Sequence, residues 1–201
     1  MGLLVLWPVL VVVAILIRVK MPGGPVIFTQ KRVGLNGELF TMYKFRSMAV
    51  NHGGSSVSVA GENRITPLGA KLRRYKLDEL PELWNVLIGD MSFVGPRPDV
   101  PGYADKLEGE DRLILKLRPG ITGPASLKYR DEEELIAAQV KNYKLKVKND
   151  LQMPEGMSDE EVAVWYNDKV IYPDKVKINL EYYRHNTLWG DLKYIIETVI
   201  V

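Results

Sequence analysis

Two adjacent carboxylates, Asp78 and Glu79, stand directly after a short cationic run. The run places four basic side chains within six residues: Lys71, Arg73, Arg74 and Lys76. A helix is expected to begin near Asp78 or Glu79, and a helix N-terminus offers free N–H donors and a partial positive charge. Such a place suits a phosphate and keeps a carboxylate ionised, so that Asp78 can attack a phosphoryl centre or hold Mg²⁺. The alternative is that Asp78 only caps the helix and the cations form a solvated face.

Two rigid turns each present one arginine. Residues 95–98 read Gly-Pro-Arg-Pro, and the two prolines pre-organise the guanidinium of Arg97, which is suited to bidentate phosphate binding. Residues 118–123 begin with Arg118 and contain two glycines, which permit close approach of the backbone to a ligand. Lys44 adds a cation in a predicted strand, where Arg46 would share its face. Each pattern taken alone is also explained by a structural turn or an exposed strand face.

The composition excludes several kinds of site. The chain has 201 residues, enough for one domain with a substantial core. Its formal net charge of +2 gives no argument for bulk nucleic-acid binding, so no nucleic acid is expected as a partner. It has no cysteine, which excludes disulfides, thiolate metal sites and cysteine nucleophiles. Its two histidines, His52 and His185, are too few for a multi-histidine metal centre.

The chain opens with an apolar run over residues 3–17, which contains Pro8 and is followed by Arg18 and Lys20. A helix of that length rises about 22 Å, short of the hydrocarbon core of about 30 Å. A cleaved signal peptide needs basic residues before the run, and here they come after it. Three alternatives remain: a transmembrane helix if the natural chain extends before Met1, a re-entrant or interfacial helix bent at Pro8, and a buried core helix.

The rest of the chain predicts one hairpin and a series of helices. Residues 26–30 and 39–45 are typical of paired strands. A helix should start with Thr66 as N-cap, and a second should run from residue 78 or 79 to Ile88, with Gly89 ending it. Ser158 and Glu161 predict a capping box. A mobile loop is expected over residues 51–62. The remaining expected helices cover residues 103–117, 131–148, 158–166, 173–183 and 188–201, the last of them amphipathic.

Taken together, these segments resemble the monotopic bacterial phosphoglycosyl transferases, a family of initiating sugar transferases. The order and spacing agree over roughly residues 3–124. The most specific block is residues 77–98, which holds both the Asp-Glu pair and the Gly-Pro-Arg-Pro turn. Residues 26–30, 43–48 and 118–123 are the other matching segments. After residue 122 the match weakens.

The resemblance implies a two-step reaction that requires Mg²⁺ as cofactor. In this family an aspartate attacks the sugar-bearing phosphate of a UDP-sugar, UMP leaves, and polyprenol (undecaprenyl) phosphate then takes the phosphosugar from the enzyme. Carried over to this chain, Asp78 is the nucleophile and Glu79 is its partner in metal binding or proton handling. The other implied site residues hold phosphate or nucleotide groups: Arg97 and Arg118, with Arg73 facing the acceptor phosphate and Lys44 as a further candidate. Cations and Mg²⁺ are needed because two anionic substrates must meet.

The resemblance also implies a fold and a location. We expect a small membrane-associated α+β domain with a short β-hairpin and surface amphipathic helices. Residues 1–20 would be a re-entrant membrane helix, truncated at its N-terminus, and residues 21–201 the catalytic domain. Family members enter one leaflet, bend at a Ser-Pro pair and return, and here Trp7 and Pro8 stand at that place. The expected location is the cytoplasmic face of the bacterial inner membrane, where the reaction starts a surface glycan.

Two other functions fit parts of the same pattern. A non-catalytic protein could bind anionic lipid through residues 71–76, and Asp78 would then have no role. A lipid phosphatase or hydrolase could use Asp78 with water in place of the lipid phosphate as acceptor. Dependence of turnover on the lipid acceptor separates this second alternative from a transferase.

Overall fold

The computed structural model describes residues 2–50, 65–145, 151 and 153–200 and has an α+β architecture. The strands are β1 (Ile27–Val33), β2 (Leu39–Phe45), β3 (Ser92–Val94) and β4 (Gly120–Thr122). The α-helices are α1 (Gly2–Lys20), α2 (Pro67–Arg74), α3 (Glu82–Ile88), α4 (Pro124–Lys128), α5 (Glu132–Lys144), α6 (Asp159–Tyr166), α7 (Tyr172–His185) and α8 (Leu188–Ile200). Short 3₁₀ helices are η1 (Leu35–Gly37), η2 (Leu77–Glu79), η3 (Ala104–Lys106) and η4 (Asp111–Lys116), and η5 (Asn167–Ile171) is a π-helix. His52 and the loop predicted over residues 51–62 lie outside the described residues.

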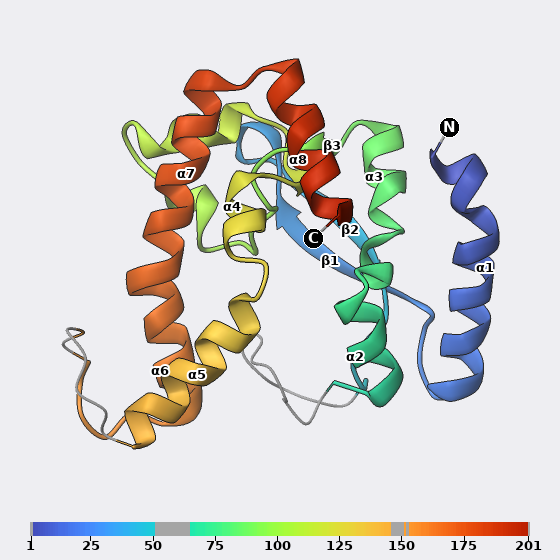
Figure 1. Cartoon of the computed structure of the whole chain (residues 1–201), viewed down its shortest axis with the longest axis horizontal. Helices are drawn as coiled ribbons and strands as arrows, with labels where there is room; N and C mark the ends of the chain where they lie inside the picture. Colours follow the sequence, from blue (N-terminus) through green and yellow to red (C-terminus); the bar gives the residue numbers. More distant parts are fainter. Residues whose placement is uncertain (1, 51–64, 146–150, 152, 201) are drawn as a thin grey trace.

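The β1–β2 hairpin runs through the middle of the molecule, with α1 on one side and α7 on the other (Figure 1). Its strands pair antiparallel along their whole length, as the sequence predicts. The turn between them places Asn36 (φ 56°) and Gly37 (φ 86°) in the left-handed region, which asparagine and glycine tolerate best. On β2, Phe40 and Met42 are buried against the core, and the two-residue period of a strand places Lys44 on the same face.

A second sheet, which the sequence did not predict, pairs β3 with β4 in parallel. It brings the turn over residues 95–98 beside the segment over residues 118–123. A Cβ added at Gly95 would lie 2.3 Å from the backbone carbonyl oxygen of Arg118, so this approach requires glycine. Residues 118–124 were predicted as a turn only, whereas residues 120–122 form a strand because a partner strand from a distant part of the chain lies beside them.

Helix α1 packs one side against the domain and leaves other apolar side chains exposed. Val13 and Ile17 are buried in a cluster with Phe45 of the hairpin, whereas Trp7 is 60% exposed. The helix is continuous through Pro8, and the re-entrant bend predicted there is not confirmed. Among the described residues, no helix combines the length and the apolar character needed to cross a membrane.

The helix predicted from residue 78 or 79 to Ile88 is correct only in its second half. Residues 77–79 form the tight turn η2, and α3 begins at Glu82 with Pro81 at its N-cap. Lys76, in the left-handed region (φ 54°), turns the chain sharply between α2 and η2, and Leu80 and Pro81 stand between η2 and α3. The prediction that Gly89 ends α3 is confirmed, with the glycine in the left-handed region (φ 89°).

The other predicted helices are present with altered bounds. The Thr66 hydroxyl accepts a hydrogen bond from the Gly69 N–H at 2.9 Å, and the capping box of Ser158 and Glu161 precedes α6. Residues 103–117 hold η3 and η4 in place of one α-helix. Helix α8 is amphipathic, as predicted, but its apolar side chains are largely exposed, and Trp189 is 80% exposed.

Candidate active site

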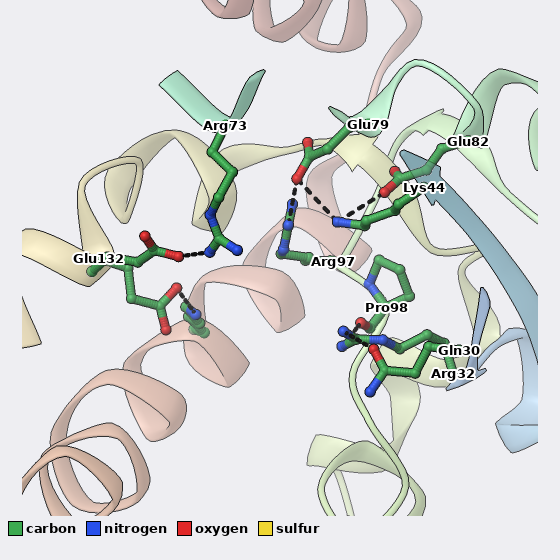
Figure 2. Close-up of polar contacts among 11 residues, drawn as sticks. Gln30, Arg32, Lys44, Arg73, Glu79, Glu82, Arg97, Pro98 and Glu132 are labelled. Carbon is green, nitrogen blue, oxygen red and sulfur yellow. Dashed lines mark hydrogen bonds and ion pairs between the residues drawn. The ribbon is translucent and has the colours of Figure 1, made fainter. Parts of the chain in front are cut away.

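Four separate segments converge on one cluster of charges (Figure 2). Lys44 comes from the end of β2, Glu79 from η2, Glu82 from the first residue of α3, and Arg97 from the turn after β3. Asp78 precedes Glu79 in η2 and is buried with it. The structure therefore brings together four of the predicted site residues, Asp78, Glu79, Lys44 and Arg97.

A buried amide fixes α3 against the strand that carries Lys44. The side chain of Asn85 is fully buried, and its Oδ1 accepts a hydrogen bond from the Tyr43 backbone N–H at 3.2 Å. Its Nδ2 donates to the backbone carbonyl oxygen of Thr41 at 2.7 Å. Because one buried side chain makes both bonds to β2, the helix cannot slide along the strand without leaving buried polar groups unpaired.

Glu79 is held in its ionised form. Its Oε1 lies 2.6 Å from Nη2 of Arg97 and 3.1 Å from Nζ of Lys44. Burial alone would raise the pKa of Glu79, but Arg97, Lys44 and Lys76 outweigh it and hold the pKa well below its usual range. In return, the Glu79 carboxylate raises the pKa of Arg97. Glu79 therefore stays charged near neutral pH and is poorly suited to carry a proton.

Asp78 has the opposite character. It is 7% exposed, and its Oδ1 is buried without a hydrogen-bond partner among the described residues. Burial and then the neighbouring Glu79 charge raise its pKa, while Lys44 and Arg73 oppose the rise. An unpaired carboxylate oxygen is costly to bury, so Asp78 is a candidate for contact with a ligand. The pKa values of the two neighbouring carboxylates are thus shifted in opposite directions, and perturbed pKa values of this kind cluster at functional sites.

Glu82 was missed as a site residue in the sequence. It is 1% exposed, and its Oε1 lies 3.0 Å from Nζ of Lys44. Burial raises its pKa, Lys44 opposes that rise, and Glu79 adds to it. One sequence feature could have indicated this role. Glu82 precedes Asn85 by three residues, which places both polar side chains on the buried face of α3.

The turn that carries Arg97 is anchored to β1. Nη1 of Arg32 donates to the backbone carbonyl oxygen of Pro98 at 3.0 Å, and Nη2 donates to Oε1 of Gln30 at 2.7 Å. The Val33 N–H also donates to the backbone carbonyl oxygen of Asp99, at 2.9 Å. Burial, with the nearby Arg97 charge, lowers the pKa of Arg32 to about 10. This anchor was not predictable from local sequence patterns, because the contact joins residues 66 positions apart.

Arg73 and Arg118 lie apart from the ion pairs of Glu79. Arg73 forms an ion pair with Glu133 of α5, and its charge also acts on Asp78, which keeps it near the cluster (Figure 2). Arg118 lines a different cleft, between β3 and the corner of α7 and α8, together with Phe93 and Asp191. Arg46, grouped with Lys44 in the sequence, lies beyond the end of β2, where it is buried and donates to the backbone carbonyl oxygen of Met21.

The carboxylates fit a divalent cation, although they do not form a ready-made cage. Within the described part of the chain, no group of three or more acidic or histidine side chains has the arrangement of a metal site. The unpaired buried Oδ1 of Asp78 nevertheless offers the hard oxygen that Mg²⁺ prefers, and Mg²⁺ commonly takes only one or two carboxylates plus substrate phosphates. Asp78, with its neighbour Glu79, therefore remains a suitable ligand pair.

Comparison with known proteins identifies the family to which this chain is similar. The profile described as "Bacterial sugar transferase" matches residues 1–160. The chain is 38% identical over 177 residues to the UDP-glucose:undecaprenyl-phosphate glucose-1-phosphate transferase of Escherichia coli (strain K12), covering 85% of this chain and 36% of that protein. It is 33% identical to the protein of the same name from Xanthomonas campestris pv. campestris, covering 99% of this chain and 36% of the relative.

A shorter relative matches a larger part of its own length. The putative undecaprenyl-phosphate N-acetylgalactosaminyl 1-phosphate transferase of Bacillus subtilis (strain 168) is 44% identical over 111 residues, covering 54% of this chain and 62% of that protein. The chain thus spans about a third of the two longer relatives and less than two thirds of the shorter one.

Proposed function

The chain belongs to the bacterial sugar transferase family, and from this premise we propose that it transfers a sugar 1-phosphate from a UDP-sugar to polyprenol (undecaprenyl) phosphate. The names of its relatives support this proposal, since they describe transfer of glucose 1-phosphate or an N-acetylgalactosaminyl 1-phosphate to undecaprenyl phosphate. The relatives differ in their sugar, so the sugar of this chain is left open. The reaction would start the assembly of a surface glycan.

The observation that carries the proposal is the contrast between the two neighbouring carboxylates. Asp78 is buried with a free oxygen, whereas Glu79 is neutralised by Arg97 and Lys44. A carboxylate that reacts with phosphorus needs a free oxygen and nearby positive charge to offset the repulsion of two anions. Asp78 meets both requirements, and Glu79 meets only the second.

The chemistry then proceeds in two displacements at one phosphorus atom. An oxygen of Asp78 attacks the sugar-bearing phosphorus of the UDP-sugar, the bond from that phosphorus to the UMP oxygen breaks, and UMP leaves with the bonding electrons. The phosphosugar remains on Asp78 as an acyl phosphate. A phosphate oxygen of the polyprenol phosphate next attacks the same phosphorus, and the bond to Asp78 breaks, which restores the carboxylate. Splitting the transfer in this way replaces one difficult step by two easier ones.

The surrounding charges supply the binding and the orientation. Arg97 and Lys44 would hold the donor phosphates, and Arg73 would face the acceptor phosphate. Bound Mg²⁺, held by Asp78 and Glu79, would withdraw charge from the phosphoryl oxygens. Because Glu79 stays ionised, its role in this scheme is to hold charge in place and not to transfer protons.

The exposed apolar surface supports an interaction with the membrane that holds the acceptor. Trp7 of α1 and Trp189 of α8 are both largely exposed, as are Leu188 and Val199 at the two ends of α8. Large exposed apolar surfaces of this kind mark lipid or protein interfaces. We place this surface on the cytoplasmic leaflet of the membrane, with α1 as the unbroken helix that the structure contains.

The test is UMP release by purified protein in lipid, with a panel of UDP-sugars, Mg²⁺ and undecaprenyl phosphate. We expect release that depends on the lipid phosphate and disappears in Asp78→Asn. Without the acceptor, mass spectrometry should find the phosphosugar on the peptide that contains Asp78. Release that is unchanged in Asp78→Asn, or that proceeds equally with water alone, would contradict the proposal, and the latter result would favour a hydrolase.

A further inference from the structure

Glu82 is a buried acid that the proposed reaction does not use. Its side chain is 2% exposed, and it occupies the first residue of α3, where the helix meets the end of β2. Nζ of Lys44 lies 3.0 Å from Oε1 of Glu82 and 3.1 Å from Oε1 of Glu79. The ammonium of Lys44 is therefore held between two carboxylates that come from different elements (Figure 2).

A purely structural role does not account well for this arrangement. Burying a carboxylate costs several kcal/mol before any compensation, and an apolar or amide side chain could pack the start of α3 at lower cost. Moreover, Oε1 of Glu82 makes no hydrogen bond of good geometry to any described residue, so its compensation comes from the nearby positive charge of Lys44. Such a contact is weak evidence for stability and points to control of the lysine's position.

The backbone around the pair is rigid enough for such control. Asn85, about one turn after Glu82, binds the backbone of Tyr43 and of Thr41, two residues apart on the same edge of β2. The backbones of Glu82 and Lys44 are therefore held close to one another, and the parts that can still adjust are the two side chains, of which the lysine is the longer. A lysine stem has four rotatable carbons, so without a second anion its ammonium would be free to swing with Glu79 alone as its anchor.

We propose that Glu82 is a positioning residue, which acts through Lys44 by holding its ammonium at a fixed point between Glu79 and the phosphate groups of the substrate. The effect on catalysis rests on the proposed function, whereas the effect on the position of Lys44 does not. Two readouts are therefore required, one of them independent of turnover.

The first readout is the ζ-ammonium of Lys44 in protein labelled with ¹⁵N-lysine, with its signal assigned by its loss in Lys44→Met. In Glu82→Gln, which preserves size and shape, we expect hydrogen exchange of this ammonium to quicken by at least about tenfold, because a charged partner is lost. Glu82→Asp keeps the charge but shortens the reach and should give a smaller increase. The control is Glu134→Gln, on an exposed residue of α5, which should leave the signal unchanged. Exchange that stays within about twofold of wild type in both Glu82 variants would overturn the proposal.

The second readout is the rate of UMP release. Glu82→Gln should lower kcat by about 10- to 100-fold with little change in KM for the UDP-sugar, because a misplaced charge acts mainly in the transition state. In a Lys44→Met background the same substitution should change kcat by less than about twofold, because a residue that acts through Lys44 has nothing left to position. Losses that multiply in the double variant would show a structural role and overturn the proposal. A wild-type protein without turnover would refute the proposed function, and the ammonium measurement would still decide the role of Glu82.

Discussion

Replacing Arg32 by lysine tests whether the site depends on an anchor that lies outside it. The guanidinium of Arg32 joins two groups, the backbone carbonyl oxygen of Pro98 at 3.0 Å and Oε1 of Gln30 at 2.7 Å. Lysine keeps the positive charge, but its single ammonium cannot span both acceptors with the geometry of a planar fork. Arg32→Lys should therefore release the turn that carries Arg97 while leaving the charge of the region unchanged.

The size of the effect follows from the bonds lost. A hydrogen bond that involves a charged group contributes about 1.5–3 kcal/mol, and the variant loses one of two such bonds. For a chain of this length each kcal/mol corresponds to about 2–4 °C, so Tm should fall by about 3–12 °C. The released turn also lets Arg97 move, and a misplacement of about 1 Å in a catalytic group can cost about 100-fold in rate. We expect kcat for UMP release to fall by about 10- to 100-fold.

The assay combines thermal unfolding, followed by circular dichroism, with the rate of UMP release below the unfolding temperature. The matched control is Lys31→Arg, which changes the neighbouring exposed position on the opposite face of β1 and should alter neither quantity. An Arg32→Lys protein with the Tm and kcat of the wild type would refute the reasoning, because the turn would then be held without Arg32. A lower Tm with an unchanged kcat would mean that Arg32 stabilises the turn but is not needed to position Arg97.

Three further predictions concern residues around this centre. Asp99 has its pKa raised to about 6, first by burial, so the folded state holds this proton more tightly than the unfolded chain; its contribution to stability should be lost as pH rises through about 6, and the loss should be absent in Asp99→Asn. Glu133→Gln removes one anionic partner of Arg73, and KM for the lipid phosphate should fall by about two- to fivefold, within the range of an ion pair at a partly exposed site. Ser158→Ala removes the capping box before α6 and should cost about 1 kcal/mol of unfolding free energy.

Each of these predictions has an outcome that would contradict it. Unfolding by urea at a series of pH values checks Asp99, and a wild type whose stability is flat between about pH 4 and 7 would contradict the raised pKa of this group. An unchanged or higher KM in Glu133→Gln would mean that Glu133 helps to orient Arg73 and does not compete for it. For the capping box, Ser126→Ala in α4 is the control, and equal losses in the two variants would remove the capping explanation.

The parts of the fold that depend on neighbouring residues were predicted well from the sequence. The hairpin, the Thr66 cap, the capping box at Ser158 and the end of α3 at Gly89 each follow from the chemistry of a few consecutive residues. The start of α3 was placed too early, because residues 77–79 form the separate 3₁₀ helix η2. Lys76 adopts a left-handed conformation that non-glycine residues rarely take, and no periodic pattern reports it.

The parts of the site that were missed depend on contacts between distant residues. Glu82 lies 38 positions from Lys44, and Asn85 lies 42 positions from Tyr43. Arg32 lies 66 positions from Pro98. Their positions on a buried face were visible from helical or strand spacing, but a buried polar residue has the same spacing as an apolar one. The catalytic candidates were found because a family motif names them, whereas their supporting residues carry no motif.

The pairing of Glu79 also changes how substrate binding must be understood. Arg97 and Lys44, the cations expected to bind the donor phosphates, each already hold a carboxylate oxygen of Glu79. In the proposed reaction, the donor phosphates would therefore meet cations that are already paired with Glu79 and not an empty cationic pocket. Lys44 and Arg97 carry several N–H donors each, so both can contact a phosphate while they keep their contact with Glu79. Asp78 lies outside these ion pairs, and its buried Oδ1 has no hydrogen-bond partner among the described residues, which is why we propose it as the carboxylate that reacts.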